Sequence, residues 1–574
     1  MKSRNLDAWL VPHSDVHRSE SLPKSEKRLA YITGFTGSAG FAIIGMKSAA
    51  LFVDGRYTLQ APLQTDTNIF EILESPDEKP GIWAKNHLAP NARMGFDPWL
   101  HTIGEIRTFN LQLKNQGNLV ATKNMLEEIW DDRPPPPFEN IELLDIKRAG
   151  IVANEKINAI KDRLENKKAD ALVLNMPETI CWLFNIRGRD IPNTPVVLSF
   201  AIVHRTKKPE LFIDPEKLGP EQGKTLSEDV TLRNIEDFPS ALEKLAKEKT
   251  TIWVDPSTCP HAIYELANNN GAFVIESPDP VMMAKAIKNP TELAGMKQAH
   301  LLDGIAIANF LCWFDRNAPE GKLTEIEIAS RLESFRTKEP SLIDISFDTI
   351  SGSGPNGAIV HYRVTENSNR ILKPGELMLI DSGGQYLCGT TDITRTLYTG
   401  SASPQQKTHF TLVLKGMIAI STLKFPKGTT GSQIDIMARH ALWQRGLNYN
   451  HGTGHGVGAF LSVHEGPAGI APRYNVALKA GMILSNEPGY YLEGEYGIRI
   501  ENLLHVINCP DFEGFLAFET LTLAPIDTRL LDTNLLDSKE IEWLNKYHEK
   551  VREKISPRLG NEQRNWLHRA TAAI

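Results

Sequence analysis

The stretch HGTGHGVGAFLSVHEGP spans residues 451–467 and contains three histidines, His451, His455 and His464, among five glycines. A glycine-rich backbone can approach a ligand closely because it carries no Cβ. Imidazoles within such a segment can therefore point inward at a common site. The stretch predicts a ligand-binding loop in the last third of the chain.

Four carboxylates surround this loop in sequence, each within a short characteristic stretch. They are Asp381 in LMLIDSGGQY, Asp392 in GTTDITRT, Glu487 in SNEPGYY and Glu501 in GIRIEN. With His455 they supply mostly oxygen ligands, which two hard divalent cations require. About four negative charges would also balance two divalent cations, so the site can be nearly neutral when buried. The set predicts a two-metal site.

The local patterns predict how these side chains are positioned. KPGELMLID is an apolar strand that ends on Asp381, and Asp392 follows eleven residues later. A two-stranded hairpin would bring both carboxylates to one point, because a strand presents alternate side chains to opposite faces. We expect Glu487 at the end of a strand and Glu501 inside another. The ligands would then come from several strands in the middle of one sheet.

Each residue also has an ordinary structural interpretation. An aspartate at a strand end is usually a turn or cap residue, and a histidine in a glycine-rich loop is usually a hydrogen-bonding residue. A buried glutamate is costly unless it is paired, and Glu501 could pair with Arg499 in a salt bridge. Five separate coincidences in one order are harder to accept than a shared metal site.

The length and the breaks in the pattern indicate several domains. A chain of 574 residues is too long for one core and suggests three or four domains. The RPPPP segment at 133–137 is a stiff spacer, and a second boundary lies near 279–288. The expected domains are residues 1–135, 136–284 and 285–574.

Two long helices are predicted in the third domain. From Pro290 onward apolar residues recur at three- and four-residue spacing, as a half-buried helix requires. Near the end, SKEIEWLNKYHEKVREKI at 538–555 is a charged amphipathic helix. We expect it to pack on the catalytic domain or on a dimer surface.

The first two domains look like copies of one unit. Three pairs of apolar stretches match at offsets of 163, 160 and 158 residues, in the same order. The pairs are DAWLV with DALVL, LFVDG with LFIDP, and MGFDP with IWVDP. Each stretch resembles a strand leaving a sheet into a turn. Helical patterns lie between them, which favours duplicated α/β sheets with helices on their faces.

Composition excludes several classes of protein. A charged content of 23% and a net charge of −7 give no basic surface for nucleic acid. Five scattered cysteines lack CxxC spacing and indicate reduced thiols. The chain shows no secretory signal at its start and no apolar run long enough for a membrane span. We expect a cytoplasmic protein that binds neither nucleic acid nor membrane.

The ordered ligand set, together with HGTGHGVG, VHEGP, EPGYY and FDTISGSGPNGAIVHYR, resembles the pita-bread metallopeptidases. Within them it is similar to the three-domain, cytosolic-type Xaa-Pro aminopeptidases, also called aminopeptidase P. The resemblance covers essentially the whole chain. It implies two creatinase-like α/β domains followed by a pita-bread α+β catalytic domain. It also implies two metal ions, usually Mn²⁺, and a homodimer assembled largely through the catalytic domain.

The resemblance assigns a role to each ligand. Asp392 and Glu501 correspond to the bridging carboxylates, and Asp381 to the terminal ligand of one metal ion. His455 and Glu487 correspond to the ligands of the other ion, and Glu487 could also accept a proton from the attacking water. A water that bridges two cations loses a proton near neutral pH and becomes the nucleophile. The same ligands accept manganese, cobalt or zinc.

Three further histidines and an arginine match positions around the metals. His361 and His464 would hold the scissile region of the substrate and stabilise negative charge on the tetrahedral intermediate. His451 would line the pocket for the penultimate proline. Arg499 would orient Glu501 or the substrate. The implied reaction is hydrolytic release of the N-terminal residue from Xaa-Pro peptides.

Three alternatives share parts of this pattern. Prolidase has the same five ligands but cleaves only Xaa-Pro dipeptides and usually has one leading domain, so the repeat argues against it. Methionine aminopeptidase is a single catalytic domain and does not need the 285 residues before it. The third alternative is a non-enzymatic binding module on the pita-bread fold, and the intact ligand set argues against it.

Overall fold

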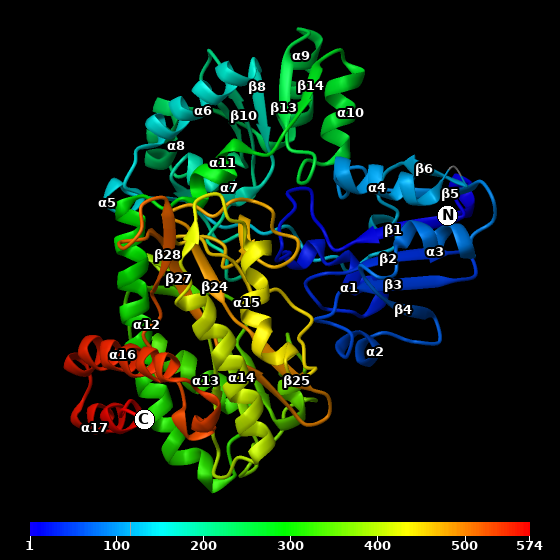
Figure 1. Cartoon of the computed structure of the whole chain (residues 1–574). Helices are drawn as coiled ribbons and strands as arrows, with labels where there is room; N and C mark the ends of the chain where they lie inside the picture. Colours follow the sequence, from blue (N-terminus) through cyan, green and yellow to red (C-terminus); the bar gives the residue numbers. More distant parts are fainter. Residues whose placement is uncertain (115) are drawn as a thin grey trace. The chain divides into compact units, whose positions relative to one another are not determined.

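The matched apolar stretches form strands in equivalent places of two separate sheets (Figure 1). The computed structural model describes residues 1–114 and 116–574. Its contacts divide the chain into two units, Met1–Met282 and Met283–Ile574, and each unit is described by itself.

The first sheet, blue in Figure 1, has the strand order β4-β3-β2-β1-β5-β6. β1 pairs antiparallel with β2 and parallel with β5. The strands are β1 (Ala8–Pro12), β2 (Phe41–Gly45), β3 (Ala49–Val53), β4 (Phe70–Glu74), β5 (Ala92–Phe96) and β6 (Gly117–Ala121).

The second sheet repeats this arrangement with the order β12-β11-β10-β8-β13-β14. β8 pairs antiparallel with β10 and parallel with β13, as β1 does with β2 and β5. The strands are β8 (Ala171–Leu174), β10 (Phe200–His204), β11 (Glu210–Phe212), β12 (Thr231–Arg233), β13 (Thr251–Val254) and β14 (Phe273–Glu276). The matched pairs β1/β8, β3/β11 and β5/β13 hold the same positions, which confirms the predicted duplicated α/β fold.

Alternate side chains of each strand face opposite cores, as the two-residue period of a strand requires. On β1, Trp9 and Val11 pack with Leu29, whereas Leu10 packs with Trp83 on the other face. The helices of this unit are α1 (Arg28–Thr33), α2 (Gln60–Gln64), α3 (Pro80–His87), α4 (Ile103–Leu113), α5 (Ile146–Ala149), α6 (Ala153–Lys167), α7 (Pro177–Leu183), α8 (Pro220–Asp229), α9 (Phe238–Lys247) and α10 (His261–Asn269). α11 (Pro280–Ala286) leads into the second unit. Both faces of the first sheet are therefore buried.

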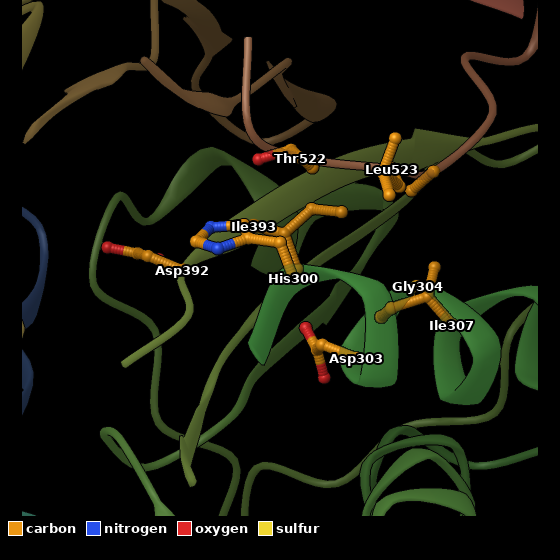
Figure 2. Close-up of a pocket in the computed structure, with 9 residues that line it drawn as sticks. His300, Asp303, Gly304, Ile307, Asp392, Ile393, Thr522 and Leu523 are labelled. Carbon is orange, nitrogen blue, oxygen red and sulfur yellow. The ribbon is translucent and has the colours of Figure 1, made fainter. Parts of the chain in front are cut away.

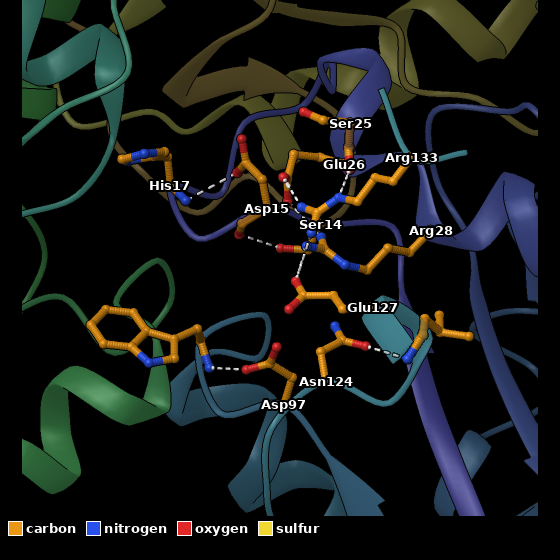
Figure 3. Close-up of polar contacts among 12 residues, drawn as sticks. Ser14, Asp15, His17, Ser25, Glu26, Arg28, Asp97, Asn124, Glu127 and Arg133 are labelled. Carbon is orange, nitrogen blue, oxygen red and sulfur yellow. Dashed lines mark hydrogen bonds and ion pairs between the residues drawn. The ribbon is translucent and has the colours of Figure 1, made fainter. Parts of the chain in front are cut away.

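An ion-pair network connects the loops beside the first sheet to one another (Figure 3). Arg28 contacts Glu26 at 2.5 Å and Glu127 at 2.9 Å, and Arg133 contacts the same two carboxylates at 2.7 and 3.0 Å. Two guanidinium groups shared by two carboxylates form a network, which holds a geometry better than an isolated surface pair. The start of the RPPPP segment is thereby fixed to the loop that precedes α1.

The second unit is built from antiparallel strands, as the pita-bread resemblance implies. The larger sheet has the order β21-β28-β27-β24-β22-β23 and a smaller one the order β16-β17-β20. Their strands are β16 (Ile350–Ser353), β17 (Met378–Ser382), β20 (Ile393–Leu397), β21 (Phe425–Pro426), β22 (Gly454–Gly456), β23 (Glu465–Ile470), β24 (Ile483–Asn486), β27 (Asn502–Asn508) and β28 (Phe515–Thr520). Shorter strands are β15 (Leu342–Ile345), β18 (Gly384–Tyr386), β19 (Gly389–Thr390), β25 (Gly489–Leu492) and β26 (Tyr496–Arg499).

Long helices accompany these sheets and bury the largest core of the chain. They are α12 (Pro290–Asn317), α13 (Glu325–Arg336), α14 (Pro404–Ser421), α15 (Gly431–Trp443), α16 (Ser538–Ile555) and α17 (Asn561–Ala570). α12 starts with a capping box between Asn289 and Glu292 and covers the predicted helical pattern. α16 spans the predicted tail helix, and its Leu544, Tyr547 and Val551 are buried in the main core. The tail helix therefore packs on the core of the second unit.

Each of the five cysteines is a free thiol, as predicted from their spacing. Within residues 1–114 and 116–574, no helix combines the length and apolar character needed to span a membrane.

Candidate metal centre

Strand pairing between β17 and β20 places the two aspartates. Asp381 lies in β17 opposite Thr394 of β20, and Asp392 directly precedes β20. The two strands pair antiparallel, as a hairpin would, but the connection between them is not a simple turn. It contains β18 and β19, which pair with each other, and β18 also pairs with β15 in a separate three-stranded sheet. The sequence predicts the pairing but not this excursion.

The two glutamates lie at the ends of strands. Glu487 directly follows β24, as predicted. Glu501 lies between β26 and β27, so the prediction that it is inside a strand is wrong. Its backbone N–H donates to the Thr394 carbonyl at 3.1 Å. Asp381 lies in the three-stranded sheet and His455 in the six-stranded sheet, so the predicted origin of all ligands in one sheet is also wrong.

The ligand atoms of Asp392, His455 and Glu501 lie within 4.8 Å of one another. His455 Nε2 is 3.4 Å from Asp392 Oδ2 and 3.3 Å from Glu487 Oε1. His455 Nδ1–H donates to the Gly456 carbonyl at 2.9 Å, and this hydrogen bond fixes the tautomer. Nε2 therefore faces the carboxylates and is the ring nitrogen that can bind a cation once it has lost its proton.

Arg499 holds Asp381 from behind. Its Nη2 donates to Asp381 Oδ2 at 2.7 Å, and its Nη1 donates to the Tyr491 hydroxyl at 2.6 Å. Arg499 Nε donates to Thr394 Oγ1 at 3.2 Å, and Thr394 Oγ1 donates to Glu501 Oε2 at 2.7 Å. Arg499 thus pairs directly with Asp381 and reaches Glu501 only through Thr394.

Tyr491 and Thr394 contact the site residues Arg499 and Glu501, but the sequence analysis did not predict them. Tyr491 lies within the EPGYY motif, and Thr394 lies two residues after Asp392. Neither residue type is a characteristic metal ligand, so spacing alone does not single them out. Their motifs contained the only available signal.

The cluster carries strong electrostatic strain without cations. Burial raises the pKa of Asp381 to about 6, against the opposing effect of Arg499. Burial and the neighbouring Asp392 carboxylate raise the pKa of Glu501 well above its usual range, and burial also raises that of Glu487. Burial alone would lower the pKa of His455, but Asp392 and Glu487 raise it to about 9. The site favours additional positive charge.

The donor set fits divalent metal ions. Asp381 Oδ1 and Glu501 Oε1 are buried and have no hydrogen-bond partner within the described residues. Buried acceptors are normally satisfied, so an orphaned pair needs an explanation such as a bound ion. Carboxylate oxygens with one imidazole nitrogen are the donors that Mn²⁺, Co²⁺ and Zn²⁺ accept.

The predicted substrate histidines lie at different distances from the cluster. The rings of His464 and His455 are 4.1 Å apart between centroids and perpendicular. His451 Nε2 accepts from the Tyr491 hydroxyl at 2.9 Å, which connects it to Arg499. His361 is half-buried on the segment after the short helix Gly354–Ala358. The structure therefore places His464 directly against the predicted ligand His455, and connects His451 to the predicted ligand Asp381 through Tyr491 and Arg499.

A small pocket lies behind Asp392 (Figure 2). His300, Asp303 and Thr522 line it, and the Asp392 carboxylate points away from the His300 ring. His300 Nδ1–H donates to the Met296 carbonyl at 2.8 Å. α12 therefore supplies the support behind this ligand.

An antiparallel unit with four clustered carboxylates and one imidazole defines a metal-dependent hydrolase, and comparison with known proteins agrees. The sequence profile of metallopeptidase family M24 matches residues 294–508, and that of its C-terminal region matches residues 514–574. Two profiles of the creatinase/prolidase N-terminal domain match residues 1–129 and 132–292.

Relatives match this chain over almost all of its length and most of their own. A probable Xaa-Pro aminopeptidase P from Paracoccidioides brasiliensis is 40% identical over 100% of this chain and 97% of its own. Aminopeptidase P2 from Arabidopsis thaliana is 39% identical over 99% and 86%. The crystal structure of X-prolyl aminopeptidase from Caenorhabditis elegans, a cytosolic enzyme with a di-nuclear active site, superimposes with a TM-score of 0.95 at 36% identity, covering 99% of this chain and 95% of its own.

The chain belongs to metallopeptidase family M24, together with the Xaa-Pro aminopeptidases P that it matches from end to end. It is an enzyme, a hydrolase with a metal-dependent site.

Proposed function

We propose that this enzyme releases the N-terminal residue from peptides with proline in the second position. The observation that carries the proposal is the cluster of Asp392, His455 and Glu501, with Glu487 3.3 Å from His455, in a chain similar throughout to Xaa-Pro aminopeptidases P. An Xaa-Pro bond lacks an amide proton and restricts the residue before it, so general aminopeptidases leave it uncut.

The ligand roles remain part of the proposal. Two divalent cations, most simply Mn²⁺, would be held by Asp381, Asp392, His455, Glu487 and Glu501, with Asp392 and Glu501 shared between them. When bound, the cations polarise the scissile carbonyl and bring the pKa of a water molecule near neutrality. The orphaned oxygens of Asp381 and Glu501 support this assignment.

The chain's own groups would perform the remaining steps. Glu487 accepts the proton that the attacking water loses, and the Ser485 hydroxyl orients it by donating to its Oε1 at 3.0 Å. His464 and His361 donate hydrogen bonds to the scissile region and stabilise the developing oxyanion. His451, fixed by Tyr491, borders the pocket for the proline ring, while Arg499 holds Asp381 in place.

A peptide comparison tests this function. Purified enzyme is stripped of metal, then reloaded with Mn²⁺, Co²⁺ or Zn²⁺ one at a time, and offered an Xaa-Pro-Xaa tripeptide or an Xaa-Pro dipeptide. We expect cleavage of the tripeptide after the first residue, with the highest rate in Mn²⁺. Hydrolysis of the dipeptide alone would replace the proposal with prolidase.

Prolidase is the second candidate because it shares the fold. An Xaa-Pro dipeptidase from Bacillus anthracis superimposes on 65% of this chain with a TM-score of 0.53 at 23% identity. The duplicated leading sheet favours the aminopeptidase, since a single leading domain would cover only part of residues 1–284.

We also propose a homodimer formed through the catalytic unit. α15 exposes Ile436, Met437 and Trp443, which are 48, 40 and 46% accessible on one helix. A second copy of this chain would cover this apolar face in a two-fold contact. Sedimentation should give twice the chain mass, and Trp443→Glu should give monomers. A wild-type monomer at micromolar concentration would refute the dimer.

The domain boundaries and compartment remain proposals as well. We place the domains at residues 1–135, 136–284 and 285–574, which the family profiles and the division at Met282 support. Limited proteolysis should cut first near 135 or 285. The cytosolic relative and the free thiols support a cytoplasmic location, which cell fractionation tests.

A further inference from the structure

A buried charge cluster lies beside His464. Glu465 is 5% exposed, and its carboxylate forms ion pairs with two lysine ammonium groups. Lys288 Nζ donates to Glu465 Oε1, and Lys285 Nζ lies 2.9 Å from Oε2. Lys285 and Lys288 are themselves buried, at 4 and 5% exposure. Each carboxylate oxygen therefore has a lysine of its own.

Glu465 occupies a decisive position in the backbone. It directly follows His464 and opens β23, where it pairs with Gly456 of β22. Gly456 in turn follows the ligand His455. A Cβ at Gly456 would lie 2.1 Å from the Glu465 carbonyl oxygen, so the two backbones are in close contact. Any shift of Glu465 moves both His464 and the strand that carries His455.

The cluster is an expensive way to stabilise this region. Removing an ion from water costs several kcal/mol even after relaxation. Apolar residues of the same size often stabilise a folded protein at least as much as a buried ion pair does. Here two lysines pair with one glutamate, and the Glu292 carboxylate adds a smaller negative influence on Lys288. Burial and Lys285 together lower the pKa of Lys288 against the pull of Glu465. Stability alone does not account for this arrangement.

We infer that Glu465, gripped by Lys285 and Lys288, is a positioning residue that sets His464 against the metal ligands. This inference rests on the proposed role of His464 in catalysis. Lys288 forms a hydrogen bond with one carboxylate oxygen and Lys285 an ion pair with the other, so the side chain is held from two sides. The peptide that joins it to His464 is thereby fixed, and the His464 ring stays 4.1 Å from the ring of His455.

The source of the two lysines adds a second consequence. Lys285 lies on α11 and Lys288 lies just before α12, in the segment that joins the two units. The Lys288 N–H also donates to the Gly481 carbonyl at 2.9 Å, so this segment is fixed at main chain and side chain. The entry of the chain into the catalytic unit is thus tied to the residue beside His464.

A double-mutant cycle on the metal-loaded full chain tests the inference. The variants are Glu465→Gln, His464→Ala and the double variant, assayed on an Xaa-Pro-Xaa tripeptide. We expect Glu465→Gln to lower kcat by about 10–100-fold, as removal of a supporting residue does. KM and the Mn²⁺ dissociation constant, measured calorimetrically, should stay within about twofold. The double variant should be no slower than His464→Ala, because Glu465 acts through His464.

A matched control separates positioning from stability. Asp190 forms an ion pair with Lys217 at 2.7 Å in the first unit, with side-chain exposures of 0 and 6%. Asp190→Asn should lower the unfolding midpoint as much as Glu465→Gln but leave kcat unchanged. If Glu465→Gln does not fold, Lys288→Met keeps the Lys285–Glu465 pair neutral and enters the same cycle.

The outcomes are distinguishable. Losses that multiply in the double variant would overturn the inference, as would a kcat of Glu465→Gln equal to that of the wild type. Full activity of His464→Ala would instead remove the proposed role of His464, and with it the basis of the inference. A changed Mn²⁺ dissociation constant in Glu465→Gln would assign the effect to His455 and also overturn it.

Discussion

Two regions of the catalytic unit bury carboxylates in opposite ways. Behind the site, Asp303 is paired with Arg336 at 2.7 Å, and Glu465 is held by Lys285 and Lys288. Burial would raise the pKa of Asp303 and Glu465, but their cationic partners lower both. In the metal cluster the pKa of Asp381 and that of Glu501 are instead raised.

The difference lies in the number of cations supplied by the chain. Each supporting carboxylate has at least one cationic partner of its own, whereas the four cluster carboxylates share Arg499 and His455. A buried charge without a partner is tolerated only when something else compensates it. Because the chain supplies too few cations to neutralise the four carboxylates, the cluster favours the binding of metal ions.

The largest expected effect comes from removing a carboxylate that we propose is shared by both cations. Asp392→Ala should lower kcat/KM by on the order of 10³-fold or more, because several kcal/mol of metal-dependent stabilisation would be lost. Peptide cleavage in saturating Mn²⁺ measures it. Wild-type activity in this variant would refute the dinuclear mechanism, whereas activity lost only at low Mn²⁺ would reduce its role to affinity.

Breaking a paired carboxylate should act on folding. Asp303→Asn leaves Arg336 buried without its counter-charge, which typically costs about 3–5 kcal/mol of unfolding free energy. Denaturant unfolding measures the loss. Asp303→Asn combined with Arg336→Met should cost less than the single change. A single variant as stable as the wild type would show that the pair is not needed.

Acid should affect the two regions with opposite signs. In the metal-free protein Asp381 has a pKa of about 6 against an ordinary 3.8, so the folded state binds more protons between these values. Its contribution to stability is present below 3.8 and is lost as the pH rises through about 6. Relative to Asp381→Asn, metal-free wild type should gain about 2–3 kcal/mol from pH 7.5 to 4.

The control for this prediction is the paired region. The lowered pKa of Asp303 means that its contribution is present above the unfolded value and is lost only in stronger acid. The difference in stability between wild type and Asp303→Asn should therefore stay constant from pH 7.5 to 5. A metal-free wild type that loses stability relative to Asp381→Asn on acidification would contradict the strained cluster.

The smallest expected effect concerns the support of Asp381. Tyr491→Phe removes the hydroxyl that accepts from Arg499 and donates to His451, and should cost about tenfold in activity or metal affinity. Tyr490→Phe is the matched control because Tyr490 packs against His409 instead. Equal losses in the two variants would mean that the hydroxyl contact has no special role.

Much of this site could be predicted from sequence because its ligands lie in short motifs. Asp381 stands at the end of the apolar stretch LMLID, and Pro488 ends the strand that leads to Glu487. Local patterns therefore place both residues. The duplicated sheets followed from apolar stretches at constant offset. Chemistry of this kind is local, and a single sequence displays it.

The remaining features depend on contacts between distant residues. Nothing near Glu501 indicates that it leaves the strand to bond Thr394, 107 positions earlier. The pairing of Glu465 with Lys285 and Lys288 is equally invisible, because lysines near a domain boundary look like solvated charges. Long-range pairing is decided by the packing of sheets, which spacing does not encode.

The bond from the Glu501 amide to Thr394 has a consequence for the dynamics of the enzyme. Glu501 contributes its carboxylate to the cluster and its amide to the hydrogen bond with Thr394 of β20. We therefore expect that breaking this hydrogen bond also displaces the carboxylate. Exchange of the Glu501 amide proton with deuterium would therefore follow the lifetime of the loaded state. The exchange rate should fall when Mn²⁺ is added, so the exchange of this single amide would report how often the metal is released.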